Sequence, residues 1–414
     1  MTLIKTSLLN AIAVAIKMLT MLGINKILAI YVGPAGYAAI GNFQNAVQMI
    51  TTLGSGAINT GVTKYTAEYH ADEAEQRKVW QTAGTIALVG SIVTGLLVAV
   101  FNRELADWFL SDEQYGSVFI WFGLTLVFFV FNTLLLAILN GKKEIKRYVC
   151  VNIIGSFFSL LVSALMIVQF CLYGALLTLA INQSLVFFVT LALCYRTTWF
   201  KLKYLVGGID KKSAINLGKF TAMAVTSAVA VPVSHIMVRN LLGENLGWDA
   251  AGYWEAMWRL SAAYLMFVTT TLGVYYLPRL AELQDPEDIK KEIIQGYKII
   301  LPVAAACGLV IYLLRDFIIN LLFSKEFMPM RDLFGWQMLG DTLKIGSWIL
   351  AYLMIGKAMM KIYIFTEVIF AFIFYILTWL FLDLFLIKAP VVSYVVNYIL
   401  YFLFSYFLIM RYFR

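Results

Sequence analysis

Two lysines interrupt the first apolar stretch of the chain, where a charged group is costly. Residues 8–32 read LLNAIAVAIKMLTMLGINKILAIYV and include Lys17 and Lys26. A helix of about 25 residues is long enough to cross a hydrocarbon core of roughly 30 Å. A lysine near the centre of that core costs about 2.5 to 3.5 kcal/mol on insertion scales. We therefore expect these ammonium groups to face a wet, protein-lined cavity and to meet an anionic group there.

Two arginines later in the chain, Arg239 and Arg259, lie at predicted depths similar to that of Lys26. Together the three cations offer what a phosphate or diphosphate needs, because they neutralise its charge and arginine adds a planar fork of donors. Lys17 would lie nearer the midplane, as a second station on the same path. The alternative for Lys26 and Arg239 is that each side chain extends to the outer interface.

The spacing of the two lysines limits what one helix can present to a cleft. Lys17 and Lys26 are nine residues apart, which is about 180° around a helix of 3.6 residues per turn. Both can face one narrow cleft only if the helix bends, for which Gly23 is the candidate position. We expect Lys17 to face inward.

Acidic residues also fall within apolar segments. Glu255 and Arg259 are spaced i,i+4 and can pair on one helix face; the pair either eases insertion, or Glu255 positions Arg259 or carries a coupling proton. Asp341 and Lys344 are predicted to form an internal ion pair, with a role of Asp341 in coupling as the alternative. Glu367 is expected to contact another helix or to carry a coupling proton.

Lys64 ends the apolar part of its predicted helix and is expected at the inner mouth, where it can meet a lipid phosphate of the bilayer or of a substrate. Trp248, Trp254 and Trp258 are expected to belong to an interfacial aromatic belt, with stacking on sugar rings as the alternative. His235 lies one turn before Arg239 and is expected to be a buried core histidine.

The composition indicates a polytopic membrane protein. Of the 414 residues, 61% are hydrophobic and 14% are charged, whereas soluble domains have about 45–50% apolar and about 25% charged residues. The net charge of +8 does not indicate nucleic-acid binding, because the basic residues fall in alternate short loops and report topology. We expect an all-α integral membrane protein.

Catalytic and metal-binding patterns are missing from the sequence. The four cysteines are irregularly spaced and there are only two histidines, so the sequence predicts neither a disulfide framework nor a metal site. It contains no P-loop, no HExxH and no nucleophile with a credible base. We expect a transporter without cofactor rather than an enzyme.

Hydropathy predicts twelve transmembrane helices joined by short connections. They span 5–32, 34–68, 80–101, 115–140, 146–170, 173–195, 213–240, 248–281, 293–314, 328–356, 361–383 and 390–411. Most lysines and arginines of the connections fall on the side shared by the two termini, which the positive-inside rule places in the cytoplasm. The loops predicted to lie outside contain only Arg103, Arg315, Lys325, Arg331 and Lys388.

The chain also repeats itself. GPAGYAAIGNF at 33–43 resembles DAAGYWEAMWR at 249–259, and ILNGKKEIKRY at 138–148 resembles MIGKAMMKIYIF at 354–365. We expect two six-helix lobes, 1–208 and 209–414, related by a pseudo-twofold axis around a central cleft, where repeats of this kind place the substrate.

Three motifs resemble those of a known family. They are VGPAGYAAIGNF at 32–43, GVTKYTAEYH at 61–70 and RDLFGWQMLGDTLKIG at 331–346. They are similar to motifs of the Wzx flippases, members of the multidrug/oligosaccharidyl-lipid/polysaccharide (MOP) exporter superfamily, which also includes the lipid II flippases and the MATE exporters. The resemblance covers essentially the whole chain, and it is strongest to the branch that acts on lipid III in enterobacterial common antigen synthesis.

The resemblance implies a protein of the bacterial inner membrane that moves an undecaprenyl-diphosphate-linked oligosaccharide from the cytoplasmic to the periplasmic leaflet by alternating access. We expect it to act as a monomer. Its partners would be bilayer lipids, a glycan polymerase and a chain-length regulator. Related lipid II flippases use cavity cations from their first, second and eighth helices. In this chain those helices carry Lys17 and Lys26, Lys64, and Arg259.

The sequence also allows three other functions, of which a membrane scaffold or glycosyltransferase partner without transport is disfavoured by the charges near the midplane. The second is an O-antigen-unit flippase with a different glycan. The third is a MATE-type cation-coupled antiporter for small molecules, in which acidic residues rather than cations would dominate the cleft.

Overall fold

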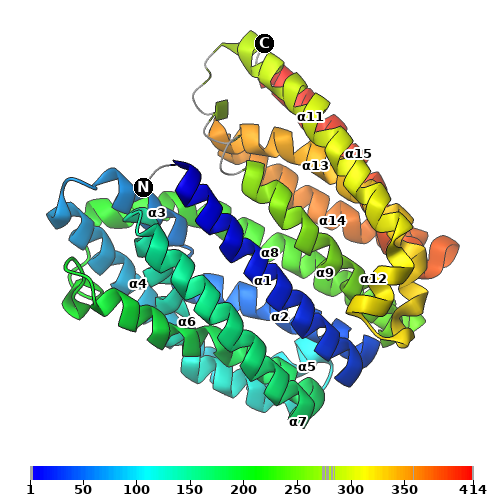
Figure 1. The fold of residues 1–414 in the computed structure, drawn as a ribbon, viewed down its shortest axis with the longest axis horizontal. Helices are drawn as coiled ribbons and strands as arrows, with labels where there is room; N and C mark the ends of the chain where they lie inside the picture. Colours follow the sequence, from blue (N-terminus) through cyan, green and yellow to red (C-terminus); the bar gives the residue numbers. More distant parts are fainter. Residues whose placement is uncertain are drawn as a thin grey trace. The chain divides into compact units, whose positions relative to one another are not determined.

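The computed structural model describes residues 3–272, 276, 279–280, 283, 285–357 and 359–412. Throughout these residues the regular structure is helical, and they include no strand. Figure 1 labels the main helices in chain order. The all-α fold expected from the composition is therefore confirmed for the part of the chain that is described.

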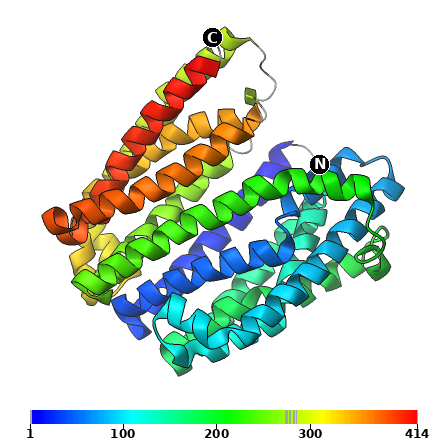
Figure 2. The same ribbon diagram turned by 180° about the vertical axis from the view of Figure 1, so that it is seen from behind.

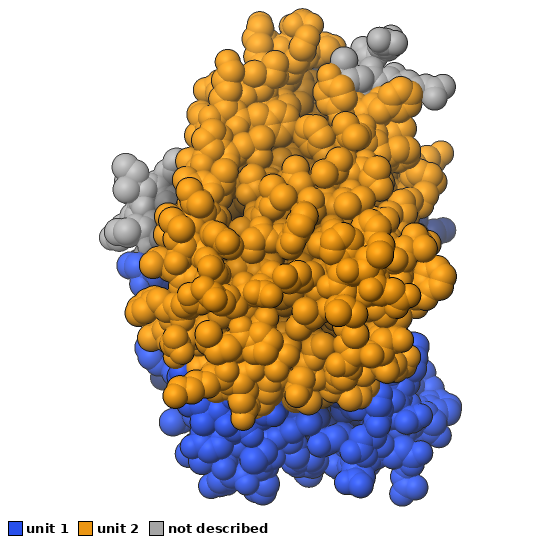
Figure 3. All heavy atoms as spheres, turned by 90° about the vertical axis from the view of Figure 1, so that its right-hand side faces the viewer, with its two compact units in different colours: residues 1–32, 42–228 blue, residues 33–41, 229–414 orange. Residues whose placement is uncertain are grey.

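The chain divides into two compact units, which Figure 3 colours separately. Unit 1 comprises residues 1–32 and 42–228, and unit 2 comprises residues 33–41 and 229–414. Relative to the predicted lobes 1–208 and 209–414, residues 209–228 belong to unit 1 and residues 33–41 belong to unit 2. The boundary after Gly41 falls inside the helix α2 (Gly33–Ser55), and the boundary after Ala228 falls inside the helix α8 (Lys211–Leu246).

Unit 1 is a bundle in which α1 packs along α7, and α6 packs against both α4 and α7 (Figures 1 and 2). Asp72 begins α4 as an N-cap, because its carboxylate accepts hydrogen bonds from the backbone N–H groups of Ala74 and Glu75. The described α-helices of this unit, beside the parts of α2 and α8, are α1 (Leu3–Tyr31), α3 (Asn59–Glu68), α4 (Glu73–Val100), α5 (Asn102–Leu110), α6 (Gly116–Gly141) and α7 (Ile145–Tyr195).

In unit 2, α13 packs against α11 and α15, and α15 also packs against α14. Figures 1 and 2 both show α15, in red, beside the orange α14. Asp285 caps α11, and Pro286 in its first turn needs no N–H partner. The described helices of this unit include α9 (Trp248–Thr271), α11 (Pro286–Leu313), α12 (Arg315–Leu322), η4 (Lys325–Leu333), α13 (Phe334–Gly356), α14 (Met360–Phe385), η5 (Leu386–Lys388) and α15 (Ala389–Tyr412), together with part of α8.

Eight helical stretches of the described residues are long and apolar enough to cross a membrane. Two of them, Ile145–Tyr195 and Met360–Ile409, contain 51 and 50 residues. An unbroken helix of that length would measure about 75 Å at 1.5 Å per residue, more than twice a hydrocarbon core of roughly 30 Å. Instead, Ile145–Tyr195 is interrupted at Cys171, and Met360–Ile409 comprises α14, η5 and most of α15, so each contains two spans. The more polar α2 and α9 lie outside this set, and the count of twelve crossing helices remains a prediction.

The internal repeat has a counterpart in the backbone. The long helix α7 is interrupted at Cys171 (φ 46°, ψ −125°), and α14 ends at Leu386 (φ 48°, ψ −125°). A positive φ is unusual for a residue other than glycine. The two positions are 215 residues apart, as are Gly141 and Gly356 of the repeated motifs. The connection after the predicted fifth helix and the one after the eleventh therefore use the same strained turn.

Candidate functional site

Glu255 holds two arginines inside unit 2. Its Oε2 accepts a hydrogen bond from Arg239 Nη1 at 2.5 Å, and its Oε1 accepts one from Arg259 Nε at 2.8 Å. The side chains of Arg239 and Glu255 are 1% and 4% exposed, and that of Arg259 is 12% exposed. Two cations share one carboxylate, so the cluster has one net positive charge and Arg259 is its most accessible member.

Two helices position this cluster. Arg239 comes from α8, and Glu255 and Arg259 come from α9 after a turn at Gly247, whose φ is 90°. The i,i+4 spacing places Glu255 and Arg259 on one helix face, which confirms the predicted pair. The contact between Arg239 and Glu255 was not predicted, because it joins residues of two helices and no local spacing reports it.

The start of α2 covers the cluster. The Tyr37 ring lies 5.6 Å from the guanidinium carbon of Arg259, within cation–π range. Tyr37 is itself fully buried and packs against Phe323 and Phe327. A β-carbon at Gly41 would lie 2.5 Å from the Glu255 carboxylate, so only glycine allows this close approach.

The segments predicted to repeat each other meet in unit 2. The backbone N–H of Ala35 donates to Asp249 Oδ1 at 3.1 Å. A β-carbon at Gly252 would lie 1.8 Å from the carbonyl oxygen of Pro34. The motif GPAGYAAIGNF therefore has a structural role beside the cluster. It could have revealed Tyr37 and Gly41 as site residues, since the sequence singled it out without assigning its members.

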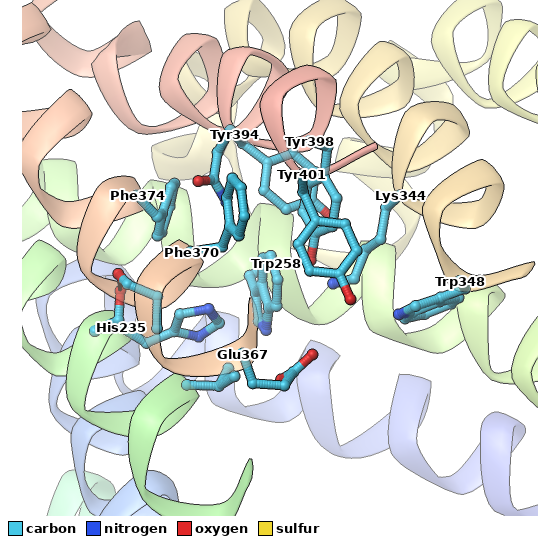
Figure 4. A pocket seen from close by; sticks show the side chains of 14 residues that line it. His235, Trp258, Lys344, Trp348, Glu367, Phe370, Phe374, Tyr394, Tyr398 and Tyr401 are labelled. Carbon is cyan, nitrogen blue, oxygen red and sulfur yellow. Dashed lines mark hydrogen bonds between the residues drawn. The ribbon is translucent and has the colours of Figure 1, made fainter. Parts of the chain in front are cut away.

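A second feature of unit 2 is a cavity of about 240 Å³ between α8, α9, α13, α14 and α15. Figure 4 shows aromatic rings and a few polar side chains gathered around it. Its polar lining includes Ser234, His235, Lys344, Glu367 and Asn397. The aromatic lining consists of Trp258, Trp348, Phe370, Phe374, Tyr394, Tyr398 and Tyr401.

Aromatic rings surround the ammonium group of Lys344, which also interacts electrostatically with Asp341 and Glu367. Its Nζ lies 4.4 Å from the ring centroid of Trp258 and between 5.2 and 5.4 Å from those of Trp348, Tyr394 and Tyr398. Such rings stabilise a desolvated ammonium through the negative charge on their faces. The side chain therefore remains a cation site inside a largely apolar environment.

The predicted ion pair between Asp341 and Lys344 is not a direct salt bridge, although the two charges interact electrostatically. Asp341 is completely buried, and its carboxylate accepts hydrogen bonds from Ser261 at 2.6 Å, Gln337 at 3.1 Å, Tyr394 at 2.8 Å and from the hydroxyl of Tyr264. These donors come from α9, α13 and α15. They satisfy the carboxylate in place of the ammonium, and the i,i+3 spacing alone could not show this.

Glu367, the second candidate for coupling, lies on α14 and lines the cavity together with Lys344. It is half-buried. Asp341 is not part of the cavity lining. The structure thus separates the two acids, one held by a hydrogen-bond network and the other beside an open space.

His235, Trp254 and Trp258 lie in or beside the aromatic cavity. His235 is buried, as predicted, and its ring centroid lies 4.3 Å from that of Trp258 and 5.5 Å from that of Trp254. Trp254 is only 1% exposed and Trp258 lines the cavity. The prediction of an interfacial belt is therefore wrong for these two residues, because they pack inside unit 2.

The three lysine candidates belong to unit 1. Lys17 is exposed and Lys26 is half-buried on α1, which is a continuous helix from Leu3 to Tyr31. Lys64 is exposed on α3, with its Nζ 5.1 Å from the ring centroid of Tyr65. The structure thus brings together Arg239, Glu255 and Arg259 in unit 2, and a common site with the lysines stays a prediction.

Comparison with known proteins gives concordant matches. Residues 3–284 match the family described as "Polysaccharide biosynthesis protein". The chain is 34% identical over 368 residues to the lipid III flippase of Escherichia coli (strain K12). This alignment covers 89% of this chain and 88% of that protein. A lipid III flippase of Shigella flexneri matches with the same identity and coverage.

Solved structures agree at the level of the fold. A multidrug resistance MATE family transporter of the MOP superfamily, in an inward-facing conformation, has a TM-score of 0.77 at 14% identity, covering 95% of each chain. The lipid II flippase MurJ has a TM-score of 0.73 at 12% identity, covering 98% of this chain and 87% of that one. At these identities the similarity concerns the fold alone.

Proposed function

Because this chain belongs to the polysaccharide biosynthesis protein family, we propose that it is a membrane flippase for lipid-linked oligosaccharides. It is a Wzx flippase of the MOP superfamily and a transporter, not an enzyme. The apolar helices make it a multi-pass protein of the inner membrane. Its similarity to lipid III flippases supports the substrate class.

The substrate that we propose is an undecaprenyl diphosphate carrying a short oligosaccharide, lipid III or a similar repeat unit. It moves from the cytoplasmic to the periplasmic leaflet by alternating access, and both chain termini lie in the cytoplasm. A diphosphate cannot enter hydrocarbon without compensation, because burying an isolated charge is very costly. Cations on its path offset that cost.

The single observation that best supports this assignment is the arginine pair shared by Glu255. The two guanidinium groups share this carboxylate inside an apolar unit, and the side chain of Arg259 keeps 12% exposure. We assign phosphate contact to Arg259, and to Arg239 the role of holding Glu255 in place. Lys17, Lys26 and Lys64 supply further cations from unit 1 during the transport cycle.

Of the two acidic residues Asp341 and Glu367, we assign proton coupling to Glu367. A carboxylate that exchanges a proton needs access to water and a neighbour that responds to its charge. Glu367 lines a cavity together with Lys344. Asp341 also interacts electrostatically with Lys344, but its hydrogen bonds all come from neutral donors and it does not line the cavity. Asp341 then serves to fix α9, α13 and α15 together.

In this proposal the protein acts as a monomer and delivers its substrate to a glycan polymerase and a chain-length regulator. A MATE-type antiporter is the second candidate, since a MATE transporter shares the fold. The described cluster carries net positive charge, which suits an anionic substrate better than a cationic drug.

Complementation tests this function. The gene is expressed in strains that each lack one known lipid-linked-glycan flippase, and surface glycan is measured. Restored export in the strain lacking the lipid III flippase is expected. Restoration only in a strain lacking an O-antigen-unit flippase would show that the substrate carries a different glycan. Drug resistance without glycan export would support the MATE-type antiporter instead.

A further inference from the structure

A second hollow of unit 2, a groove of about 490 Å³, is distinct from the aromatic cavity and shares no lining residue with it. It is formed where the end of α11 meets α12, η4, the start of α13 and η5. Its lining includes Tyr312, Arg315, Arg331, Asp332, Trp336 and Lys388. None of these residues belongs to the site proposed for the transported substrate.

The groove has one more cation than it has carboxylates. Arg331 Nε pairs with Asp316 Oδ1 at 2.7 Å, and Lys388 Nζ pairs with Asp332 Oδ2 at 3.2 Å. Arg315 forms no ion pair with any described residue. With Asp316 counted as the partner of Arg331 beside the lining, three cations and two carboxylates leave a net charge of +1. An arginine fork without a carboxylate is suited to bind an oxyanion.

Contacts of Arg315 hold its guanidinium in a defined place. Its Nη1 donates to the carbonyl oxygen of Tyr312 at 2.8 Å, and the guanidinium carbon lies 4.3 Å from the Tyr312 ring centroid. The stacked ring leaves the remaining N–H donors in the guanidinium plane available. The charge is therefore fixed by an aromatic ring and a carbonyl rather than neutralised.

Apolar side chains border the groove. Trp336 and Leu339 line it and are exposed. Leu314 directly precedes Arg315, Phe317 lies two residues after it, and Leu386 lies two residues before Lys388. All three are exposed as well. In a membrane protein such residues face lipid, and tryptophan favours the level of the headgroups. A ligand with a charged head and an apolar body fits both parts.

The cations of the groove are also exceptions to the charge pattern of the loops. Among the five basic residues in loops predicted to lie outside, three line this groove: Arg315, Arg331 and Lys388. The positive-inside rule favours few cations there. Their convergence on one groove gives them a role that topology does not require.

We propose that this groove binds the phosphodiester headgroup of an anionic phospholipid of the surrounding membrane. Arg315 contacts the phosphate, Lys388 and Arg331 border it, and Trp336 and Leu339 pack against the glycerol backbone and the start of the acyl chains. The net charge of +1 matches a single phosphodiester better than a diphosphate. The inference does not depend on which glycan is transported.

Native mass spectrometry of the full-length protein with added phosphatidylglycerol tests this site. Arg315→Ala and Lys388→Ala should each weaken binding of the first lipid about fivefold, because one basic residue at a membrane surface contributes about 1 kcal/mol. Lys325→Ala is the matched control. Lys325 is a cation at the start of η4, and its side chain does not line the groove. Arg315→Lys should recover part of the affinity.

Two further ligands identify the source of the phosphate. Inorganic phosphate and a zwitterionic phosphatidylcholine should each compete poorly with phosphatidylglycerol. Equal binding of phosphatidylglycerol by wild type and both alanine variants would overturn the proposal, as would equal competition by inorganic phosphate. If Arg315→Ala does not fold, Lys388→Ala still decides the outcome, because its side chain is 40% exposed and little packing is lost.

Discussion

Gly41 lies directly against the carboxylate of Glu255, and a β-carbon at residue 41 would lie 2.5 Å from both its Cδ and its Oε2. Non-bonded carbon atoms rest at about 3.5 to 4.0 Å, so any side chain at residue 41 must displace Glu255. Glu255 in turn fixes Arg239 and Arg259. A glycine on α2 therefore controls the position of charges on α8 and α9.

Gly41→Ala is expected to reduce flipping strongly while the protein still reaches the membrane. Overpacking a filled site costs about 1 to 3 kcal/mol, and the displaced carboxylate would also move Arg259. Surface glycan in a complementation strain and protein level in isolated membranes are the two measurements. Loss of both together would mean that the substitution only prevents folding.

Gly218→Ala is the matched control for that substitution. Gly218 lies in α8, and a β-carbon there would meet nothing within 4 Å. Alanine in an open helical position stabilises by up to about 1 kcal/mol relative to glycine. Normal flipping is expected, and a defect as large as that of Gly41→Ala would mean that the contact with Glu255 is not the cause.

Glu255→Gln should lower thermal stability more than the double variant Glu255→Gln/Arg239→Met. Removing one partner of a buried ion pair costs about 3 to 5 kcal/mol because it leaves an uncompensated charge, and removing the second charge as well relieves much of that cost. Thermal unfolding of the purified proteins in one detergent measures the difference. Equal midpoints for the single and double variants would contradict the shared-carboxylate arrangement.

An exposed pair gives the comparison for this experiment. Arg77 and Glu73 are spaced i,i+4 and lie 2.6 Å apart, with side chains 38% and 58% exposed. Glu73→Gln should leave the thermal midpoint unchanged, because solvent screens exposed ion pairs and they contribute little. Glu73→Gln and Glu255→Gln make the same chemical change at an exposed and at a buried position. A lower thermal midpoint for Glu255→Gln alone would therefore show that burial of the ion pair, not the loss of a carboxylate as such, causes the instability.

Much of the fold could be predicted from hydropathy, and the physical reason is local. Every buried backbone group must be satisfied within its own helix in lipid, so long apolar stretches report helices directly. The break predicted between residues 170 and 173 falls at Cys171. The division into units could not be predicted, because Gly33–Gly41 join unit 2 through contacts with residues more than 200 positions away.

The candidate site was predictable only where its contacts are local. The pair of Glu255 and Arg259 follows from helical spacing alone. Asp341 and Lys344 have an equally favourable spacing, yet tyrosine, serine and glutamine donors reach Asp341 from α9, α13 and α15. Such tertiary hydrogen bonds leave no local pattern, so they override the ion pair that the sequence indicated.

Asp341→Asn tests whether this carboxylate is structural. The amide nitrogen cannot accept a hydrogen bond, so at least one of the buried donors of Ser261, Tyr264, Gln337 and Tyr394 loses its partner, at a cost of about 1 to 3 kcal/mol. We expect a lower thermal midpoint and unchanged flipping per folded molecule. Wild-type stability with abolished flipping would instead make Asp341 a transport residue.

Glu367→Gln should leave the fold intact and make flipping insensitive to an imposed proton gradient. Glutamine has nearly the same shape but cannot carry a proton, and the aromatic cavity beside Lys344 keeps its lining. Headgroup translocation in proteoliposomes with and without the gradient measures the response. Asp383→Asn, at an exposed position of the same helix, should respond as wild type does. A full response in Glu367→Gln would exclude this carboxylate from coupling, because a group that cannot exchange a proton cannot transmit the gradient.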